Sequence, residues 1–136
     1  MRAVVETGDS VVVVDLEEDE LIGVERGATL GRVELELDLP LVVAADQNGP
    51  TILALVERRP PLVVSRDAGT TWNEIGAGLP PGRAIAISPE HPDLMLFASE
   101  SRLYVSHDGG RFWHALSVEL EDIRAVAWLT DVENDL

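Results

Sequence analysis

The chain of 136 residues contains no cysteine and no lysine, and only 4% of its residues are aromatic. Without cysteine it has no disulfide framework, no thiolate zinc site and no cysteine nucleophile. No apolar run reaches the roughly 18 residues that a membrane span needs. The first twenty residues carry one arginine, and Glu6 and Asp9 interrupt their short apolar runs, which does not predict a signal peptide. We therefore expect a cytoplasmic protein.

Positive charge is also scarce, because ten arginines stand against 25 acidic residues and give a formal net charge of −15. Binding to nucleic acid needs clustered basic side chains that displace counterions, and an anionic membrane surface repels a chain of this charge. We expect neither nucleic acid nor a membrane as partner. The hydrophobic fraction of 46% nevertheless indicates a folded chain, and its length suits one domain.

The sequence repeats itself at a fixed offset along the chain. Residues 65–72 read SRDAGTTW, and residues 106–113 read SHDGGRFW. The flanking segments keep the same offset, since residues 62–64 match 103–105 and residues 83–87 match 124–128. A decayed copy precedes them, in which residues 11–14 match 52–55 and residues 21–24 match 62–65. Residues 2–5 echo the segment at 83–87, one residue out of step.

Each repeat contains four short segments that are rich in β-branched and aromatic residues and bounded by turn residues. In the best-preserved copy they are residues 83–88, 93–100, 102–107 and 111–117. Four strands in a unit of about 40 residues are typical of a β-propeller blade. The sequence therefore predicts an all-β protein with a single β-propeller-type domain over residues 1–136. Its blades are expected at about 1–40, 41–81 and 82–122, with an extra strand within 123–136.

The two octets resemble the Asp-box, or BNR repeat, with the pattern S-x-D-x-G-x-T-W. This motif occurs in sialidases, sortilin-type receptors and a photosystem assembly factor. The first octet matches every fixed position, whereas the second has Phe112 in place of threonine. The segment at 24–31, where a third octet would lie, keeps none of the serine, aspartate, glycine or tryptophan. The matched positions are Ser65, Asp67, Gly69, Thr71, Trp72, Ser106, Asp108, Gly110 and Trp113.

The resemblance implies a structural motif in the hairpin between the third and fourth strands of a blade, on the face opposite a sialidase-type active site. The aspartate accepts hydrogen bonds from backbone N–H groups, and the glycine supplies a positive φ. Serine and threonine satisfy neighbouring backbone groups, and the tryptophan packs against the next blade. A metal site at Asp67 or Asp108 is the alternative, but it needs more oxygen ligands than one aspartate offers.

No catalytic set emerges from the sequence, and no cofactor is expected. Sialidases use an arginine triad, a tyrosine paired with glutamate, and an aspartate, whereas the single tyrosine here, Tyr104, lies in a strand that leads into a box. Glycosidase chemistry needs two facing carboxylates, and 25 acidic residues make accidental pairs inevitable. The three histidines, His91, His107 and His114, lack the spacing of metal ligands. We therefore expect a protein that is not an enzyme.

Arginines form the one pattern that suggests a ligand. Arg2, Arg83 and Arg124 each begin a predicted innermost strand, and Arg58, Arg59 and Arg102 fall in turns expected on the same face. An arginine ring at the channel mouth would favour a carboxylate or phosphate, as in an anionic glycan. The alternative is that solvated arginines pair with acids expected on that face, namely Glu17 to Glu20, Glu119, Glu121 and Asp122. Glu17 to Glu20 could instead bind calcium, although a solvated turn is the usual role of such a run.

Two functions follow from these expectations. The first is a non-catalytic binding or assembly scaffold that presents one propeller face to a partner protein. The second is a glycan- or anion-binding, sialidase-like domain that uses the arginine-rich mouth.

Propellers close with about four to eight blades, so three blades would leave open ends. We expect two copies to form a six-bladed ring, in which the extra strand of each copy supplies the inner strand of the other's first blade. A ring of three copies, or one shared with another short propeller chain, is the alternative.

Overall fold

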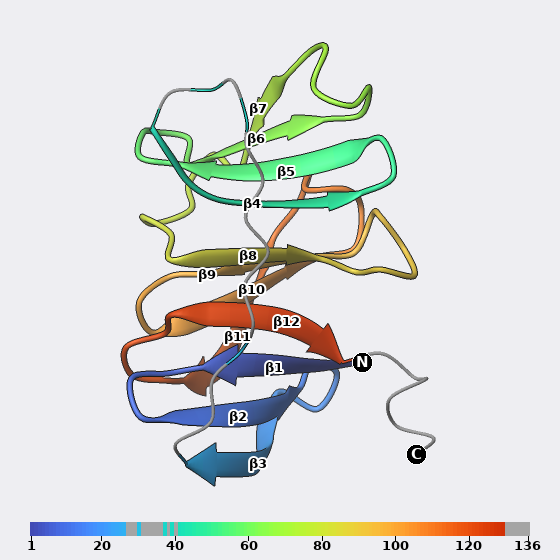
Figure 1. Ribbon diagram of the computed structural model, residues 1–136. Coiled ribbons are helices and arrows are strands. Elements are labelled where there is room, and N and C mark those ends of the chain that lie inside the picture. The colour runs from blue at the N-terminus through green and yellow to red at the C-terminus, as the bar shows by residue number, and fades with distance from the viewer. Residues whose placement is uncertain (27–29, 31–36, 38, 40, 130–136) are drawn as a thin grey trace.

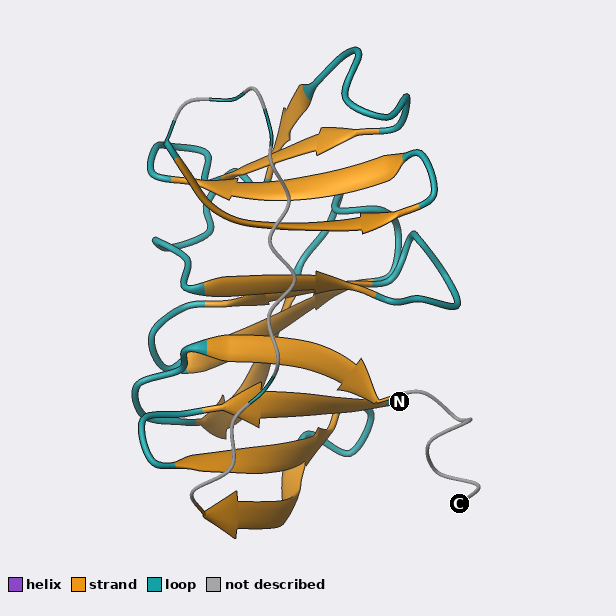
Figure 2. Ribbon diagram, viewed as in Figure 1, coloured by secondary structure: helices purple, strands orange, loops and turns teal. Residues whose placement is uncertain are grey.

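The computed structural model describes residues 1–26, 30, 37, 39 and 41–129. Within these residues every regular element is a β-strand, and the strands form three four-stranded antiparallel sheets (Figure 2). The described part of the chain contains no helix that is long and apolar enough to cross a membrane. The all-β prediction is confirmed for these residues.

Sheet C is the best-preserved repeat, and its strands follow one another in chain order. They are β8 (Ala84–Ile87), β9 (Met95–Ala98), β10 (Arg102–Ser106) and β11 (His114–Glu119). Each lies within or overlaps one of the four predicted segments. The strands are shorter than predicted or displaced along the chain, because residues at the segment ends belong to turns: the Ser88 and Ser99 hydroxyls accept backbone N–H groups of the turns that follow, and residues 111–113 complete the second box.

Sheet B repeats this arrangement with β4 (Val42–Asn48), β5 (Thr51–Val56), β6 (Leu62–Ser65) and β7 (Asn73–Ile75). Every residue of β5 and β6 is buried, which is typical of strands covered on both faces. The outermost strand, β7, has only three residues, and two of them are exposed.

Sheet A combines the two ends of the chain, and its order is β12 (Ala125–Leu129), β1 (Arg2–Glu6), β2 (Ser10–Asp15) and β3 (Glu20–Arg26). β1 lies between β12 and β2, with Arg2 opposite both Leu129 and Asp15. The prediction that Arg2 begins an innermost strand is therefore wrong. The offset predicted for the decayed copy is wrong as well, because β2 is the third strand of its sheet.

The extra strand predicted near the C-terminus exists as β12, but it pairs with β1 of its own chain. Five consecutive residue pairs join the two strands, from Arg2 with Leu129 to Glu6 with Ala125. The backbone groups that were expected to pair with a second copy are thus used within the chain. Residues 130–136, the rest of the segment predicted for this strand, lie outside the described residues.

Sheet C lies between the other two sheets, and its first strand β8 contacts both β4 and β12 (Figure 1). Two apolar layers hold the stack together. The layer between sheets A and C includes Val5, Val14, Leu96, Leu103, Leu116 and Ile123. The layer between sheets B and C includes Leu53, Leu55, Leu62, Met95 and Phe97. This arrangement is consistent with a partial β-propeller, whereas closure of a ring by a second copy stays a prediction.

The outer face of sheet B, which points away from sheet C, is covered by the chain itself. Ala54, Val56 and Val63 are buried on this face. Leu37, Leu39 and Trp72 pack against them. The open end expected on this side of the stack is therefore not bare, because Leu37 and Leu39 of the chain itself pack on it.

The two ends of the strands carry different chemistry. At one end, the box end, lie residues 65–72, residues 106–113 and the turn between β2 and β3. At the opposite end, the arginine end, lie the β5–β6 and β9–β10 turns and the starts of β8 and β12 (Figure 1). Arg2 and Glu17 to Glu20 belong to the box end, since β1 and β2 meet there at Arg2 and Asp15. Their predicted place beside the other arginines is wrong.

Candidate functional site

The first box closes the β6–β7 hairpin through a network centred on Ser65, which is fully buried. The Ser65 hydroxyl donates to Asp67 Oδ1 at 2.8 Å and accepts the N–H of Gly69 at 2.7 Å. Asp67 also accepts the N–H of Thr71 at 2.8 Å and the Thr71 hydroxyl at 2.6 Å. These bonds satisfy the polar groups of a tight turn that the strands leave unpaired.

The second box builds the same network in the β10–β11 hairpin. The Ser106 hydroxyl donates to Asp108 Oδ1 at 2.8 Å and accepts the N–H of Gly110 at 2.8 Å. Asp108 Oδ1 also accepts the N–H groups of Arg111 and Phe112, at 3.1 and 3.0 Å. Phe112 has no hydroxyl, so the bond from side chain to carboxylate that Thr71 makes in the first box is absent here.

Hydrogen bonds also set the charge state of the two box aspartates. The Thr71 hydroxyl, followed by the Thr71 N–H and the Ser65 hydroxyl, lowers the pKa of Asp67 to about 2. The pKa of Asp108 is also lowered, chiefly by the N–H of Phe112. Donors directed at a carboxylate favour its ionised form. Both carboxylates therefore act as fixed acceptors in the turn.

Both boxes place a glycine at φ 93°, a conformation that side chains rarely adopt, but the two glycines differ in their surroundings. A Cβ added to Gly69 would meet Ile52 and Trp72 at 3.8 Å, an ordinary contact distance. A Cβ added to Gly110 would lie 2.4 Å from Ile75 Cδ1 of sheet B. The second box therefore packs closely against the neighbouring sheet.

The two box tryptophans also meet different neighbours. Trp113 packs on the apolar layer between sheets B and C, with its ring edge-on to Phe97 at a centroid distance of 6.1 Å. Its indole N–H donates to the carbonyl of Gly110 at 3.0 Å. Trp72 lies on the outer face of sheet B, where Leu37 and Leu39 pack nearby. Within the part of the chain that the structure describes, the expected contact with a neighbouring sheet is therefore made by Trp113 and not by Trp72.

Five of the six arginines predicted there lie at the arginine end, and three of these five lie beside a carboxylate. Arg83 lies 3.4 Å from Asp122 and 3.7 Å from Glu100, and Arg124 lies 3.0 Å from Asp122. Arg102 pairs with Glu119. Solvated pairs of this kind neutralise the charge that an anion would need, so the geometry favours the predicted alternative over a ligand site. Arg58 and Arg59 are exposed in the β5–β6 turn.

The acidic turn at Glu17 to Glu20 connects two sheets. Asp19 accepts the N–H of Ser117 at 2.6 Å and that of Val118 at 3.1 Å, which joins the β2–β3 turn to β11 of sheet C. The Ser117 N–H is the main cause of a lowered pKa for Asp19. Among the described residues, no group of three or more histidine, aspartate or glutamate side chains is arranged to hold a metal ion.

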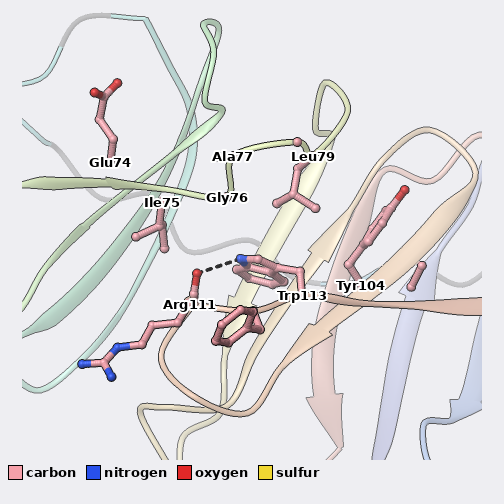
Figure 3. Close-up of a pocket in the computed structure, with 12 residues that line it drawn as sticks. Glu74, Ile75, Gly76, Ala77, Leu79, Tyr104, Arg111 and Trp113 are labelled. Atoms are coloured by element: carbon pink, nitrogen blue, oxygen red, sulfur yellow. Dashed lines mark hydrogen bonds between the residues drawn. The ribbon is translucent and has the colours of Figure 1, made fainter.

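A groove that the sequence did not predict opens beside the second box, between sheets B and C (Figure 3). Its volume is about 650 Å³. We call it the aromatic groove and define it by Ile75, Leu79, Tyr104, Phe112, Trp113 and Ala115. Glu74 and Arg111 line it as well, and Figure 3 shows their charged ends directed away from Trp113. The departure of Phe112 from the box pattern is the one sequence signal that could have indicated this surface.

Two side chains of innermost strands, Asp46 and Trp128, make contacts that the sequence did not predict, although the two residues occupy equivalent positions of the repeat. Asp46 of β4 accepts the N–H of Ile87 at 2.7 Å, and the indole of Trp128 donates to the carbonyl of Ala86 at 3.2 Å. Each bond ties the backbone of β8 to a side chain of a neighbouring sheet, Asp46 to sheet B and Trp128 to sheet A. Their role here is to hold the stack together.

Comparison with known proteins adds little to this picture. No protein-family model and no curated protein sequence matches the chain. Among solved structures, the chain is similar to a GH74 enzyme from Niastella koreensis, with 19% sequence identity and a TM-score of 0.46. The similarity covers 89% of this chain but only 18% of that one. Membership of the Asp-box family therefore stays a prediction from the two octets.

Proposed function

We propose that the chain is a non-catalytic binding or assembly module whose contact surface is the aromatic groove. The exposure of one aromatic ring supports this proposal. Phe112 is 78% exposed at the rim of a groove that also holds Trp113 and Tyr104. Trp113 and Tyr104 are half-buried, so Phe112 is the exposed aromatic of the groove. An exposed aromatic ring beside an apolar concavity is typical of binding surfaces, because it offers a large apolar area at low entropic cost.

The surroundings of the polar candidates support a role without catalysis. Tyr104 packs edge-on against Phe97 at a centroid distance of 5.6 Å, so its ring belongs to the apolar layer. Asp122, Glu100 and Glu119 are engaged with arginines, and the box aspartates are engaged with their turns. The second candidate function, a glycan- or anion-binding arginine end, is less favoured because these arginines already meet carboxylates.

A mapping experiment separates the two functions. Amide shifts of the isotope-labelled chain are recorded against small aromatic alcohols, neutral disaccharides, sialic acids, uronic acids and sugar phosphates. We expect shifts at residues 74–79 and 110–115 with the aromatic probes. Shifts confined to Arg83, Arg102 and Arg124 with the anions would favour the second function, and a double variant, Arg83→Ala with Arg124→Ala, should then abolish them.

The same samples test the absence of catalysis. We expect no product from chromogenic sialosides and other glycosides after prolonged incubation between pH 4 and 8. Steady release of product that survives repurification would overturn a non-catalytic role.

A further inference from the structure

Phe112 occupies a position where a box residue normally helps to hold the turn. In the first box, Thr71 donates its hydroxyl to Asp67 at 2.6 Å. At the equivalent place in the second box, Phe112 contributes only its backbone N–H, to Asp108 at 3.0 Å, and leaves its ring 78% exposed. The chain thus gives up a charge-assisted hydrogen bond and places an aromatic ring in water. Natural chains break such local rules chiefly at functional sites, which makes Phe112 a candidate contact residue.

The groove beside this ring combines an apolar recess with two side chains of opposite charge. Ile75, Leu79 and Trp113 form an apolar wall, and Phe112 stands at its rim. Glu74 and Arg111 line the same groove, and both are exposed. Among the described residues, neither forms an ion pair. A two-fold interface sets residue i of one copy against residue j of the other, so a patch with a ring, a recess and one charge of each sign offers each feature a counterpart on a second copy.

We propose that a second copy of this chain docks on the aromatic groove about a two-fold axis. Each Phe112 ring enters the groove of the other copy, and Arg111 faces the partner's Glu74. This inference rests on the proposed function, because it names the partner of the same surface. It differs from ring closure, which would use the faces of the end sheets.

Burial of the ring supplies most of the attraction, because exposed ion pairs contribute little. The charge pairs fix the orientation, since the opposite arrangement would set Glu74 against Glu74 and Arg111 against Arg111. The two copies also repel each other through a net charge of −15 on each. Moderate salt screens this long-range repulsion, so association should strengthen between about 10 and 150 mM salt.

Analytical ultracentrifugation over a wide concentration range tests the proposal. The wild-type chain should move from 14.8 kDa toward twice that mass as concentration rises. Phe112→Thr restores the box pattern, so it should keep or raise the melting temperature while its dissociation constant rises at least tenfold. Val24→Thr on β3 is the matched control, because Val24 is 56% exposed and lies on sheet A, outside the groove. That variant should associate like the wild type.

Charge reversal provides a second test that does not depend on the ring. Arg111→Glu and Glu74→Arg should each weaken association several-fold, and the two together should restore it. Association that is equal in the wild type and in Phe112→Thr would overturn the proposal, as would a mass of 14.8 kDa at every concentration. If aromatic probes still bind the groove of such a monomer, the proposed function survives. If neither probes nor copies bind there, both fail.

Discussion

The two box hairpins have the same internal bonding and different surroundings. In each, a buried serine and an aspartate accept hydrogen bonds from the backbone N–H groups of the turn. The first box then places its tryptophan on the outer face of sheet B, whereas the second places its tryptophan between two sheets. The comparison shows that the octet specifies a turn, while the neighbours of that turn decide what each residue contributes.

The tryptophans should give the largest difference between the boxes. Trp113→Ala removes a ring that packs on Phe97 and on the layer between sheets B and C, and we expect a loss of about 3–4 kcal/mol in the free energy of unfolding. Trp72→Ala removes contacts on one covered face and should cost about 2 kcal/mol. Urea denaturation measures both values. Equal losses would show that Trp72 is held as firmly as Trp113.

The glycines should give the next largest difference. Gly110→Ala combines a positive φ with the approach of Ile75, so we expect a loss of about 3 kcal/mol in the free energy of unfolding. Gly69→Ala has the same φ, but its added Cβ would meet neighbours only at ordinary contact distance. We therefore expect a loss of about 1 kcal/mol in the free energy of unfolding. Truncation of Ile75 should relieve the first variant, since Gly110→Ala with Ile75→Val removes the carbon in closest approach. A double variant no more stable than Gly110→Ala would contradict the packing argument.

The smallest expected difference between the two boxes is in how strongly the stability that each aspartate contributes depends on pH. The pKa of Asp67 is lowered from 3.8 to about 2, so its ionised form stabilises the fold. This contribution is complete above the unfolded pKa and is lost as pH falls through the folded pKa. Between about pH 4 and pH 2, the melting temperature of Asp67→Asn should therefore depend less on pH than that of the wild type.

Asp108→Asn should show the same trend to a smaller extent, because Asp108 lacks the hydroxyl donor that Thr71 gives to Asp67. Phe112→Thr supplies that hydroxyl, so it should make the acid titration of the second box resemble that of the first. A Phe112→Thr protein whose melting temperature follows the wild-type profile down to pH 2 would contradict the role given to Thr71.

Much of sheets B and C could be predicted from the sequence, because the repeated segments fix the order of short strands and turns. The box bonds could be predicted as well, since they span at most four residues and depend on few side chains. Sheet A could not. Its N-terminal part has lost the octet. Without that marker, the 41-residue repeat predicted that β2 corresponds to β5, whereas in the structure β2 corresponds to β6, the third strand of its sheet.

The aromatic groove was also beyond prediction, because its lining comes from two sheets. Ile75 and Leu79 follow the first box, whereas Tyr104 and Trp113 belong to the second hairpin. Nothing in either segment indicates that they face each other. The same holds for Asp19, whose bonds to Ser117 and Val118 join positions almost a hundred residues apart.

By itself, the sequence determined the strand character of the chain and the geometry of its two box turns, because both arise from neighbours along the backbone. Only the tertiary structure decided that β12 pairs with β1, that Leu37 and Leu39 cover sheet B, and that Phe112 stands beside a groove. A strand has two edges and two faces, and its own residues state how apolar the faces are but not which segment will meet them. That choice depends on all the apolar area that the chain can bury at once.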